Sequence, residues 1–320
     1  MGTLQNELPI VWRHDVENGI YEEARVGRVF NHKRPKRYPR AVVQASEEAH
    51  VICAVRLAVE LGCRVSARFG GHSWAAWSVR DDAILIDLGN YHHIEFDEDK
   101  QIIIISPSTT GKVLADFLST KSVMFYGGHC PDVGLGGFLL QGGMGWNCKN
   151  WGWACEQIAA IDCVTAKGQL VHCDATHHQD LYWAARGAGP GFLGVVTKFY
   201  LNVSPSYSNI LSSTFIYPVS EYRKVLDWVV KIAPSFDEDT EIVSVACIPA
   251  GAPALSGSCI LANFLTFKNS DEAARTALKS VPRAPEKQEA VEEVDEREDF
   301  NKPTHTDGRE PPRSIITYVV

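Results

Sequence analysis

The amino-acid sequence predicts an α+β protein with more than one domain. A short apolar run at residues 41–44, an amphipathic segment and a second apolar run at residues 63–67 give the order strand, helix, strand. Near Leu211 the pattern changes to longer strand-like segments around one helix. The chain has 320 residues, of which 45% are apolar and 22% charged, and this is enough for a sizeable core in more than one domain.

The first predicted helix lies between these two strands. We expect Ser46 to be its N-cap, with Glu47 and Glu48 at the positive end of the helix dipole, and Gly62 to end it. Ligands commonly bind at the carboxyl ends of such strands, so the loop after residue 67 is a candidate binding loop. The apolar face of this helix is predicted to consist of Val51, Val55, Ala58 and Val59.

Further strands are predicted at residues 83–87 and 102–106, and we interpret them as a pair. A short helix follows at residues 110–118, with Val113, Leu114 and Phe117 on its apolar side. This completes the α+β pattern of the first domain.

The second domain is predicted from a strand at residues 211–217, a helix at 219–232 and two strands at 242–248 and 258–267. The helix carries Val225, Trp228 and Val229. We expect an antiparallel sheet covered by helices.

These patterns divide the chain into four predicted parts. Residues 1–37 are interpreted as a lead-in exposed to solvent, because residues 25–40 hold seven Lys or Arg and no acidic residue. Residues 38–205 form the first domain and residues 206–282 the second. Residues 283–320 hold ten acidic and six basic residues and few large apolar ones, which predicts a disordered tail.

The net charge and the cysteines indicate which partners, location and covalent cross-links to expect. A net charge of −8 disfavours nucleic acid or an anionic membrane as partner. The first residues lack the charged and apolar regions of a secretory signal, and no apolar run approaches a membrane span, which predicts a cytoplasmic protein. Nine cysteines at irregular spacing indicate free thiols rather than a disulfide framework.

Two glycine-rich segments each carry a nucleophilic side chain. The first is Arg68-Phe69-Gly70-Gly71-His72-Ser73 and the second is Gly127-Gly128-His129-Cys130-Pro131. Paired glycines let backbone N–H groups form a concave nest for pyrophosphate, while the next side chain points at the ring system of the ligand. An imidazole and a thiolate can each bond to an electrophilic carbon of an oxidised flavin. Together the segments predict two covalent flavin anchors, His72 and Cys130, with Arg68 balancing the phosphate charge.

Either segment alone favours a plainer interpretation, since a cysteine in an apolar run is more often a small buried side chain. The stretch after Cys130 favours the flavin interpretation, because residues 133–145 hold six glycines in thirteen positions. Such a composition is poor for an ordinary helix or strand and suits a backbone packed against a flat ligand.

Zinc and nicotinamide binding are the alternatives that the sequence disfavours. Four cysteines and a histidine cluster near residue 160, but six to nine residues separate the cysteines, whereas structural zinc sites pair ligands two to four residues apart. No G-x-G-x-x-G follows a first strand and opens a helix. We therefore expect no metal. The zinc candidates are Cys148, Cys155, Cys163, His172 and Cys173.

Over residues 38–203 the sequence resembles the berberine bridge enzyme-like FAD-linked oxidases of the vanillyl-alcohol-oxidase superfamily. The resemblance rests on the two glycine-rich segments and on three downstream segments at residues 165–168, 180–187 and 192–197. It implies a PCMH-type FAD-binding domain of two subdomains that hold FAD, followed by a partial substrate domain with an antiparallel sheet.

The same resemblance implies roles for individual residues. His72 would bond the 8α-methyl carbon of FAD and Cys130 would bond C6 of the isoalloxazine. Val133 would line the approach to the flavin C4a, where a valine is similar to the oxidases. The cofactor-binding residues implied by the loops and the resemblance are Arg68, Phe69, Gly70, Gly71, His72, Ser73, Cys130, Val133, Gly134, Gly136, Gly137, Gly142, Gly143, Gly145, Ile158, Val195 and Val196.

The implied activity is oxidation of a C–H bond next to oxygen or nitrogen in a small-molecule substrate such as an alcohol, sugar, amine or secondary metabolite. Dioxygen would accept the electrons and form hydrogen peroxide. No catalytic base is assigned, because core packing explains Tyr126, His129 and Trp146 at least as well.

The resemblance also implies that the sequence lacks a carboxyl-terminal part which supplies the base and much of the substrate pocket in relatives. Three alternatives therefore stay open. They are a truncated flavin-binding protein without redox turnover, a catalyst of non-redox cyclisation in a biosynthetic pathway, and a non-catalytic domain whose glycines only form turns.

Overall fold

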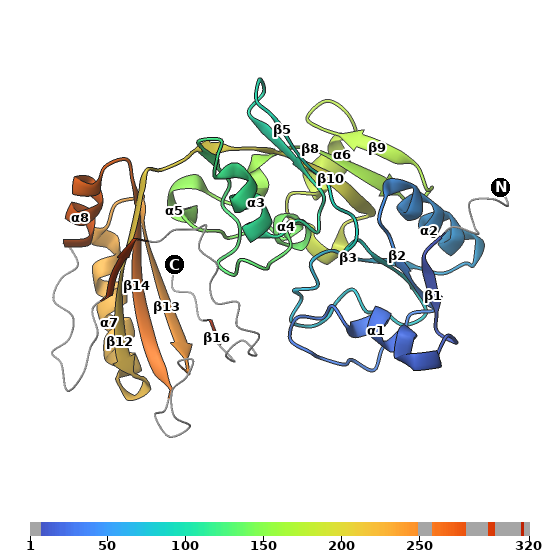
Figure 1. Ribbon diagram of the computed structural model, residues 1–320, viewed down its shortest axis with the longest axis horizontal. Helices are drawn as coiled ribbons and strands as arrows, with labels where there is room; N and C mark the ends of the chain where they lie inside the picture. The colour runs from blue at the N-terminus through green and yellow to red at the C-terminus, as the bar shows by residue number, and fades with distance from the viewer. Residues whose placement is uncertain (1–7, 249–257, 280–293, 298–314, 317–320) are drawn as a thin grey trace. The chain divides into compact units, whose positions relative to one another are not determined.

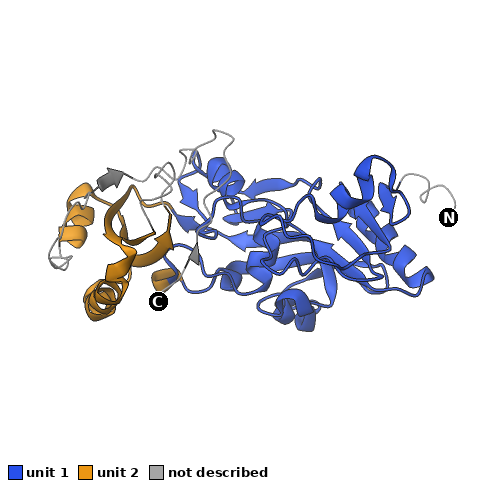
Figure 2. Ribbon diagram, turned by 90° about the horizontal axis from the view of Figure 1, so that it is seen from below, with its two compact units in different colours: residues 1–148, 152–205 blue, residues 149–151, 206–320 orange. Residues whose placement is uncertain are grey.

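The computed structural model describes residues 8–248, 258–279, 294–297 and 315–316. The described residues fall into two compact units (Figure 2), and residues 149–151 belong with the second, which resumes at Ser206. Most of the predicted tail at 283–320 lies outside the described residues. Among the described residues, no helix has the length and apolar character needed to span a membrane.

The first sheet of unit 1, whose strands β1, β2 and β3 are labelled in Figure 1, has the order β1-β2-β4-β3. Strands β2 and β3 both run parallel to β4, and β1 runs antiparallel to β2. Helix α2 connects β2 to β3, which confirms the predicted order of strand, helix and strand. The bounds are β1 Ile10–Trp12, β2 Ala41–Gln44, α2 Glu48–Glu60, β3 Val65–Arg68 and β4 Ile84–Asp87.

Helix α2 buries Val51, Ala54, Val55 and Ala58 against this sheet. Two details of the prediction are wrong. The N-cap position is Glu47 and no side-chain cap hydrogen bond is formed, so Ser46 does not cap the helix. Val59 is 62% exposed, because the 100° step per residue turns it past the edge of the buried stripe.

The second sheet of unit 1 is antiparallel throughout and has the order β5-β6-β10-β8-β9. The predicted pairing of residues 83–87 with 102–106 is wrong, because β4 and β6 lie in different sheets. Strand β4 is buried along its whole length between two parallel neighbours, whereas β6 pairs with the nearby β5. The bounds are β5 Ile94–Asp97, β6 Ile102–Ile105, β8 Ile158–Thr165, β9 Leu170–Cys173 and β10 Gly194–Asn202.

Short elements lie between or after the strands of these sheets along the chain, and two of them, β7 and β11, pair with each other. Helix α3 begins as predicted, since the Thr110 side chain accepts a hydrogen bond from the Val113 backbone N–H. Val113 itself is exposed, so its predicted place on the apolar side is wrong. The bounds are η2 Glu17–Gly19, α1 Ile20–Val26, α3 Gly111–Leu118, β7 Val123–Met124, α4 Leu135–Leu140, α5 Cys148–Trp151, η3 Ala154–Gln157, α6 Gln179–Ala184, η4 Gly189–Gly191 and β11 Ser204–Pro205.

The interpretation of residues 1–37 as a solvated lead-in is wrong for the residues from Leu8 onward. Strand β1 joins the first sheet, and α1 buries Tyr21 and Ala24 against Val42. Arg25 is buried, pairs with Glu22 and donates hydrogen bonds to backbone carbonyls of the basic segment. The charge of Arg25 is therefore compensated by partners inside the fold, and its side chain is not solvated.

Unit 2 is built on an antiparallel sheet in the order β15-β12-β14-β13-β16. Helix α7 packs Val225, Val229 and Ile232 against Ile260 and Phe264 of the sheet, which confirms the predicted sheet covered by a helix. Together the two units have the predicted α+β class. The bounds are β12 Asn209–Pro218, η5 Val219–Glu221, α7 Tyr222–Ile232, η6 Ala233–Ser235, β13 Thr240–Cys247, β14 Cys259–Lys268, α8 Asp271–Lys279, β15 Val294–Arg297 and β16 Ile315–Ile316.

Candidate flavin site

The His72 loop begins where β3 ends at Arg68, at the carboxyl edge of the first sheet. Gly71 has a φ of +77°, and a Cβ there would overlap the Arg28 carbonyl, so only glycine fits. The His72 ring stacks on Phe30, with ring centroids 4.1 Å apart and planes within 12°. Ser73 Oγ accepts a hydrogen bond from the Trp77 backbone N–H at 3.2 Å. The imidazole is therefore held on a rigid turn.

The Cys130 loop is fixed to the start of α3 by backbone hydrogen bonds. Gly111 N–H donates to the Val133 carbonyl at 3.1 Å, and Lys112 N–H donates to the Pro131 carbonyl at 2.8 Å. The Cys130 thiol is free and half-buried. Burial raises its pKa, and the nearby negative charge of Asp132 raises it further.

The structure brings the two loops together although His72 and Cys130 are far apart in the sequence. A Cβ on Gly70 would come within 2.6 Å of the Gly134 backbone, and the reverse holds for Gly134. One side chain also bridges the loops, because an oxygen of Asp132 lies 3.1 Å from His72 Nε2. The two predicted anchors therefore belong to one locality of unit 1.

The glycine-rich run is more regular than its composition predicts. Residues 135–140 form the helix α4, so the expectation that the run avoids helix is wrong there. Most of its glycines are required by close approach of the protein itself: Gly136 lies against Phe69 and Pro107, and Gly145 against the backbone carbonyl of Tyr126. Gly137 differs, since among the described residues no atom outside its neighbours and its own helix backbone lies within 4 Å of the place where its Cβ would be.

Other residues of the predicted set lie at different places in the same unit. Gly142 and Gly143 both have positive φ, and a Cβ on Gly143 would crowd Phe138. Ile158 begins β8, while Val195 and Val196 lie on the paired strand β10, and all three side chains are buried in the core.

The predicted role of Arg68 in balancing phosphate charge is wrong. Its side chain is fully buried and forms an ion pair with Asp87 at 2.7 Å. It also donates hydrogen bonds to the Ala24 and Arg25 carbonyls at 2.5 and 2.7 Å. Arg28 pairs with the other oxygen of Asp87. A guanidinium with these partners connects β3 to α1 and β4, and it is not directed at a ligand.

Tyr126 and His129 adjoin the Cys130 loop. Burial raises the pKa of Tyr126 to about 12, so its hydroxyl stays protonated at neutral pH. The His129 ring packs on Trp146 with centroids 4.2 Å apart. These contacts are those of packed side chains, and we assign no catalytic base among them.

The cysteines considered for zinc do not gather into a site. All nine cysteines are free, which confirms the predicted free thiols. Cys163 and Cys173 lie on neighbouring strands with sulfur atoms 3.8 Å apart. Within the described ranges, no group of three His, Cys, Asp or Glu side chains has the arrangement of a metal site.

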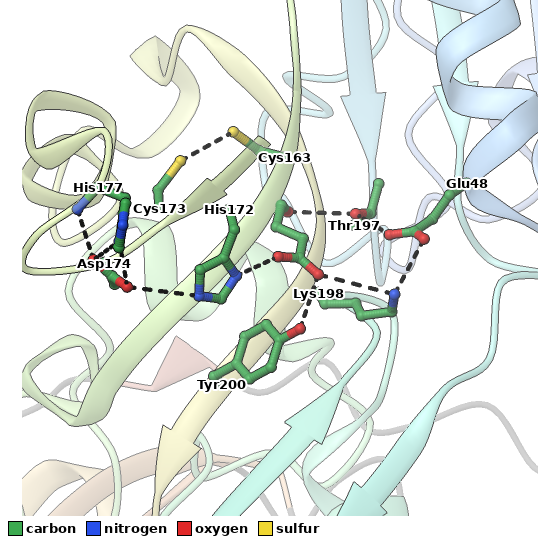
Figure 3. A network of polar contacts seen from close by, with 10 residues as sticks. Glu48, Cys163, His172, Cys173, Asp174, His177, Thr197, Lys198 and Tyr200 are labelled. Carbon is green, nitrogen blue, oxygen red and sulfur yellow. Dashed lines mark hydrogen bonds and ion pairs between the residues drawn. The ribbon is translucent and has the colours of Figure 1, made fainter. Parts of the chain in front are cut away.

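A polar network joins the two sheets of unit 1 (Figure 3). Lys198 Nζ lies 3.1 Å from Glu48 on α2 and 3.9 Å from Asp162 on β8. Asp162 also accepts a hydrogen bond from Tyr200 at 2.9 Å and contacts His172 at 2.7 Å. The network ties the helix α2, which packs on the first sheet, to strands of the second sheet.

Sequence reasoning missed Phe30 and Asp132. Phe30 lies on the segment interpreted as a lead-in, and nothing in its neighbourhood marks it as a partner of His72. Asp132 had a usable signal, since it is an acidic residue two positions after the predicted anchor Cys130.

The fold of unit 1 is that of PCMH-type FAD-binding domains, and comparisons with known proteins agree. A family model described as an FAD binding domain matches residues 39–174. FAD-linked oxidoreductase nodO of Hypoxylon pulicicidum is 41% identical over 274 residues, which are 86% of this chain and 60% of that protein.

Solved structures show the same fold. BBE-like 1 of Physcomitrella patens superposes with a TM-score of 0.77 at 21% identity, covering 92% of this chain and 63% of that chain. Xylooligosaccharide oxidase from Myceliophthora thermophila C1 superposes with a TM-score of 0.71 at 25% identity, covering 91% and 60%.

Residues 39–174 thus match the model of an FAD binding domain, and the fold is shared with BBE-like 1. The chain is a homologue of FAD-linked oxidoreductases. It spans 60% of the length of nodO.

Proposed function

We propose that this chain contains the FAD-binding part of an oxidase that carries its flavin on both His72 and Cys130. The observation that supports the proposal most directly is the meeting of the two loops, which places both nucleophiles in one locality although 58 positions separate them, counted as 130 minus 72. The match of residues 39–174 to an FAD binding domain supports the identity of the ligand.

The side chains present fit an attached flavin. An imidazole and a thiol are groups that can form bonds to flavin carbons, and the thiol of Cys130 is not used in a disulfide. The backbone at Gly137 is open to the approach of a flat ligand. Backbone N–H groups on the glycine-rich turns are suited to phosphate oxygens, which replaces the role first given to Arg68.

When bound, FAD would supply a two-electron acceptor for a C–H bond next to oxygen or nitrogen and would return the electrons to dioxygen. The residues of this chain would hold the flavin and orient its ring system. Phe30 fixes the plane of the His72 ring, and the contact of Gly70 with Gly134 fixes the spacing of the loops. Two attachments remove the freedom of the ring system to rotate, which favours one pose toward a substrate.

The likeness to xylooligosaccharide oxidase supports oxidation of a CH–OH group with oxygen as acceptor. FAD-linked oxidoreductases of fungal origin among the relatives support a small-molecule donor more broadly, including a secondary metabolite. The second candidate function is flavin binding without turnover, and it is favoured by the packed contacts of Tyr126 and His129, among which no catalytic base is assigned.

The test is a visible spectrum of the purified full chain, followed by acid precipitation and a hydrogen peroxide assay with a panel of sugars, alcohols and amines. Yellow colour that stays with the pellet and peroxide with one donor class are the expected results. A colourless, soluble and folded protein contradicts the proposal. A yellow pellet without peroxide from any donor favours the second candidate function.

Val133→Leu is expected to slow reoxidation of the reduced flavin by dioxygen by about tenfold or more, because the longer leucine side chain, which has one more carbon, narrows the approach to the flavin. Val133 is half-buried and its backbone is tied to Gly111, so the change is local. Stopped-flow mixing of reduced protein with oxygenated buffer measures the rate. Val113→Leu on the exposed side of α3 is the matched control. Equal rates in wild type and Val133→Leu contradict the placement of Val133 beside the flavin.

A further inference from the structure

Unit 2 places two cysteines directly opposite each other on neighbouring antiparallel strands. Cys247 is the last residue of β13 and Cys259 is the first residue of β14, and the strand register pairs them. Both thiols are free, and their sulfur atoms lie 3.5 Å apart. Directly opposite residues of an antiparallel pair have Cα atoms about 4.5–5.5 Å apart. A disulfide bridges Cα atoms at this spacing, so the backbone already has the geometry that the bond requires.

The two thiols differ in their exposure to reagents. Ala246 and Ile260 belong to the core that α7 covers. Because residues alternate between the two faces of a strand, the neighbouring cysteines lie on the opposite face of the sheet. Cys247 is half-buried, whereas Cys259 is only 8% exposed. A small disulfide in solution therefore reaches Cys247 first, and Cys259 is placed to react with the group that forms there.

The pair Cys163 and Cys173 in unit 1 lacks both properties, although its sulfur atoms are 3.8 Å apart. Cys163 stands opposite Val171, and Cys173 stands opposite Ile161, so the two cysteines are diagonal neighbours. Diagonal neighbours are about 7–8 Å apart at their Cα atoms, and a disulfide at that spacing requires the backbone to move. Both side chains are also fully buried. This pair is therefore a natural comparison within the same chain.

We propose that Cys247 and Cys259 form a reversible disulfide by exchange with a low-molecular-weight disulfide of the glutathione type. The Cys247 thiolate attacks one sulfur of the small disulfide, whose S–S bond breaks and releases one thiol. The Cys259 thiolate then attacks the Cys247 sulfur of the mixed disulfide and releases the second thiol. The two cysteines lose two protons and two electrons, and the two released thiols carry them.

The new bond would cross-link β13 to β14 at the end of their pairing. The stability of this end of the sheet would then depend on the redox state of the small thiols around the protein. The proposal goes beyond flavin attachment and does not depend on it, because neither cysteine belongs to the glycine-rich segments.

The test treats the wild-type full chain with glutathione disulfide, blocks the remaining thiols and maps the peptides by mass spectrometry without reduction. Burial raises the pKa of the Cys247 thiol, and the adjacent Cys259 sulfur raises it further, so the exchange is followed for hours at about pH 8.5. We expect at least about tenfold more Cys247–Cys259 disulfide than glutathione retained on Cys247, because the adjacent thiol acts at a high effective concentration. Dithiothreitol should reverse the bond.

Cys259→Ser removes the second nucleophile and is expected to trap one glutathione on Cys247. Cys173→Ser is the matched control, and it should form the Cys247–Cys259 disulfide as the wild type does. In the wild type, Cys163 and Cys173 should stay reduced, and circular dichroism before and after treatment shows that the chain is folded. A Cys247 that stays reduced in the wild type, or one that retains glutathione there, overturns the proposal.

Discussion

Replacing His72 and Cys130 together by alanine is expected to move all of the flavin from the acid precipitate to the supernatant. Each single substitution leaves one covalent bond, so His72→Ala and Cys130→Ala should each retain colour in the pellet. The double substitution leaves only noncovalent contacts, which do not survive acid denaturation. Absorbance of pellet and supernatant after precipitation, with flavin fluorescence on a denaturing gel, measures the distribution.

Cys53→Ala is the matched control, since Cys53 is also partly buried and free but lies on α2 and in neither glycine-rich segment. It should keep all of the colour in the pellet. A circular dichroism melt of each variant shows whether the loss of the stacking between His72 and Phe30 unfolds the chain. A folded double variant that still pellets with its flavin would contradict attachment through these two residues.

Asp87→Leu is expected to lower the free energy of unfolding by about 3–5 kcal/mol. The substitution leaves the guanidinium of Arg68 buried without a counter-charge, and breaking a buried ion pair from one side is costly. It also removes the acceptor for the Gly89 backbone N–H at 3.0 Å. Urea unfolding followed by circular dichroism measures the change.

The double variant Arg68→Met with Asp87→Leu separates the cost of an unpaired charge from that of lost packing. It should be more stable than Asp87→Leu alone, because both charges are then absent. Asp116→Ala, which breaks an exposed pair with Lys112 on α3, should change stability by only about 0.3–0.5 kcal/mol. Equal stabilities of Asp87→Leu and Asp116→Ala would contradict a structural role for the Arg68 pair.

Local patterns in the sequence predicted the elements well. The bounds of β2 and the end of α3 were predicted correctly. Both depend on the pattern of apolar residues within a short stretch of sequence. The partner of a strand is a nonlocal property, and for that reason the pairing of residues 83–87 was predicted wrongly. Nothing in the composition of four apolar residues states which sheet they join.

The predicted site shows the same limit. The two loops could be predicted from the glycine pairs close to His72 and Cys130, because a nucleophile on a tight turn is a local arrangement of neighbouring residues. The true partner of Arg68 is Asp87, 19 positions later, counted as 87 minus 68, and residue type alone could not distinguish it from a phosphate. The glycines were explained by an expected ligand, whereas in the structure most of them make room for other parts of the protein.

The contact between Gly70 and Gly134 has a consequence for how this domain can vary. A side chain on either residue would collide with the backbone of the other, so neither loop can change at that point while its neighbour stays in place. A change of backbone position in one loop therefore requires a matching change in the other. A designer who wished to move the His72 turn into another scaffold would have to graft the Cys130 turn with it, at the same spacing.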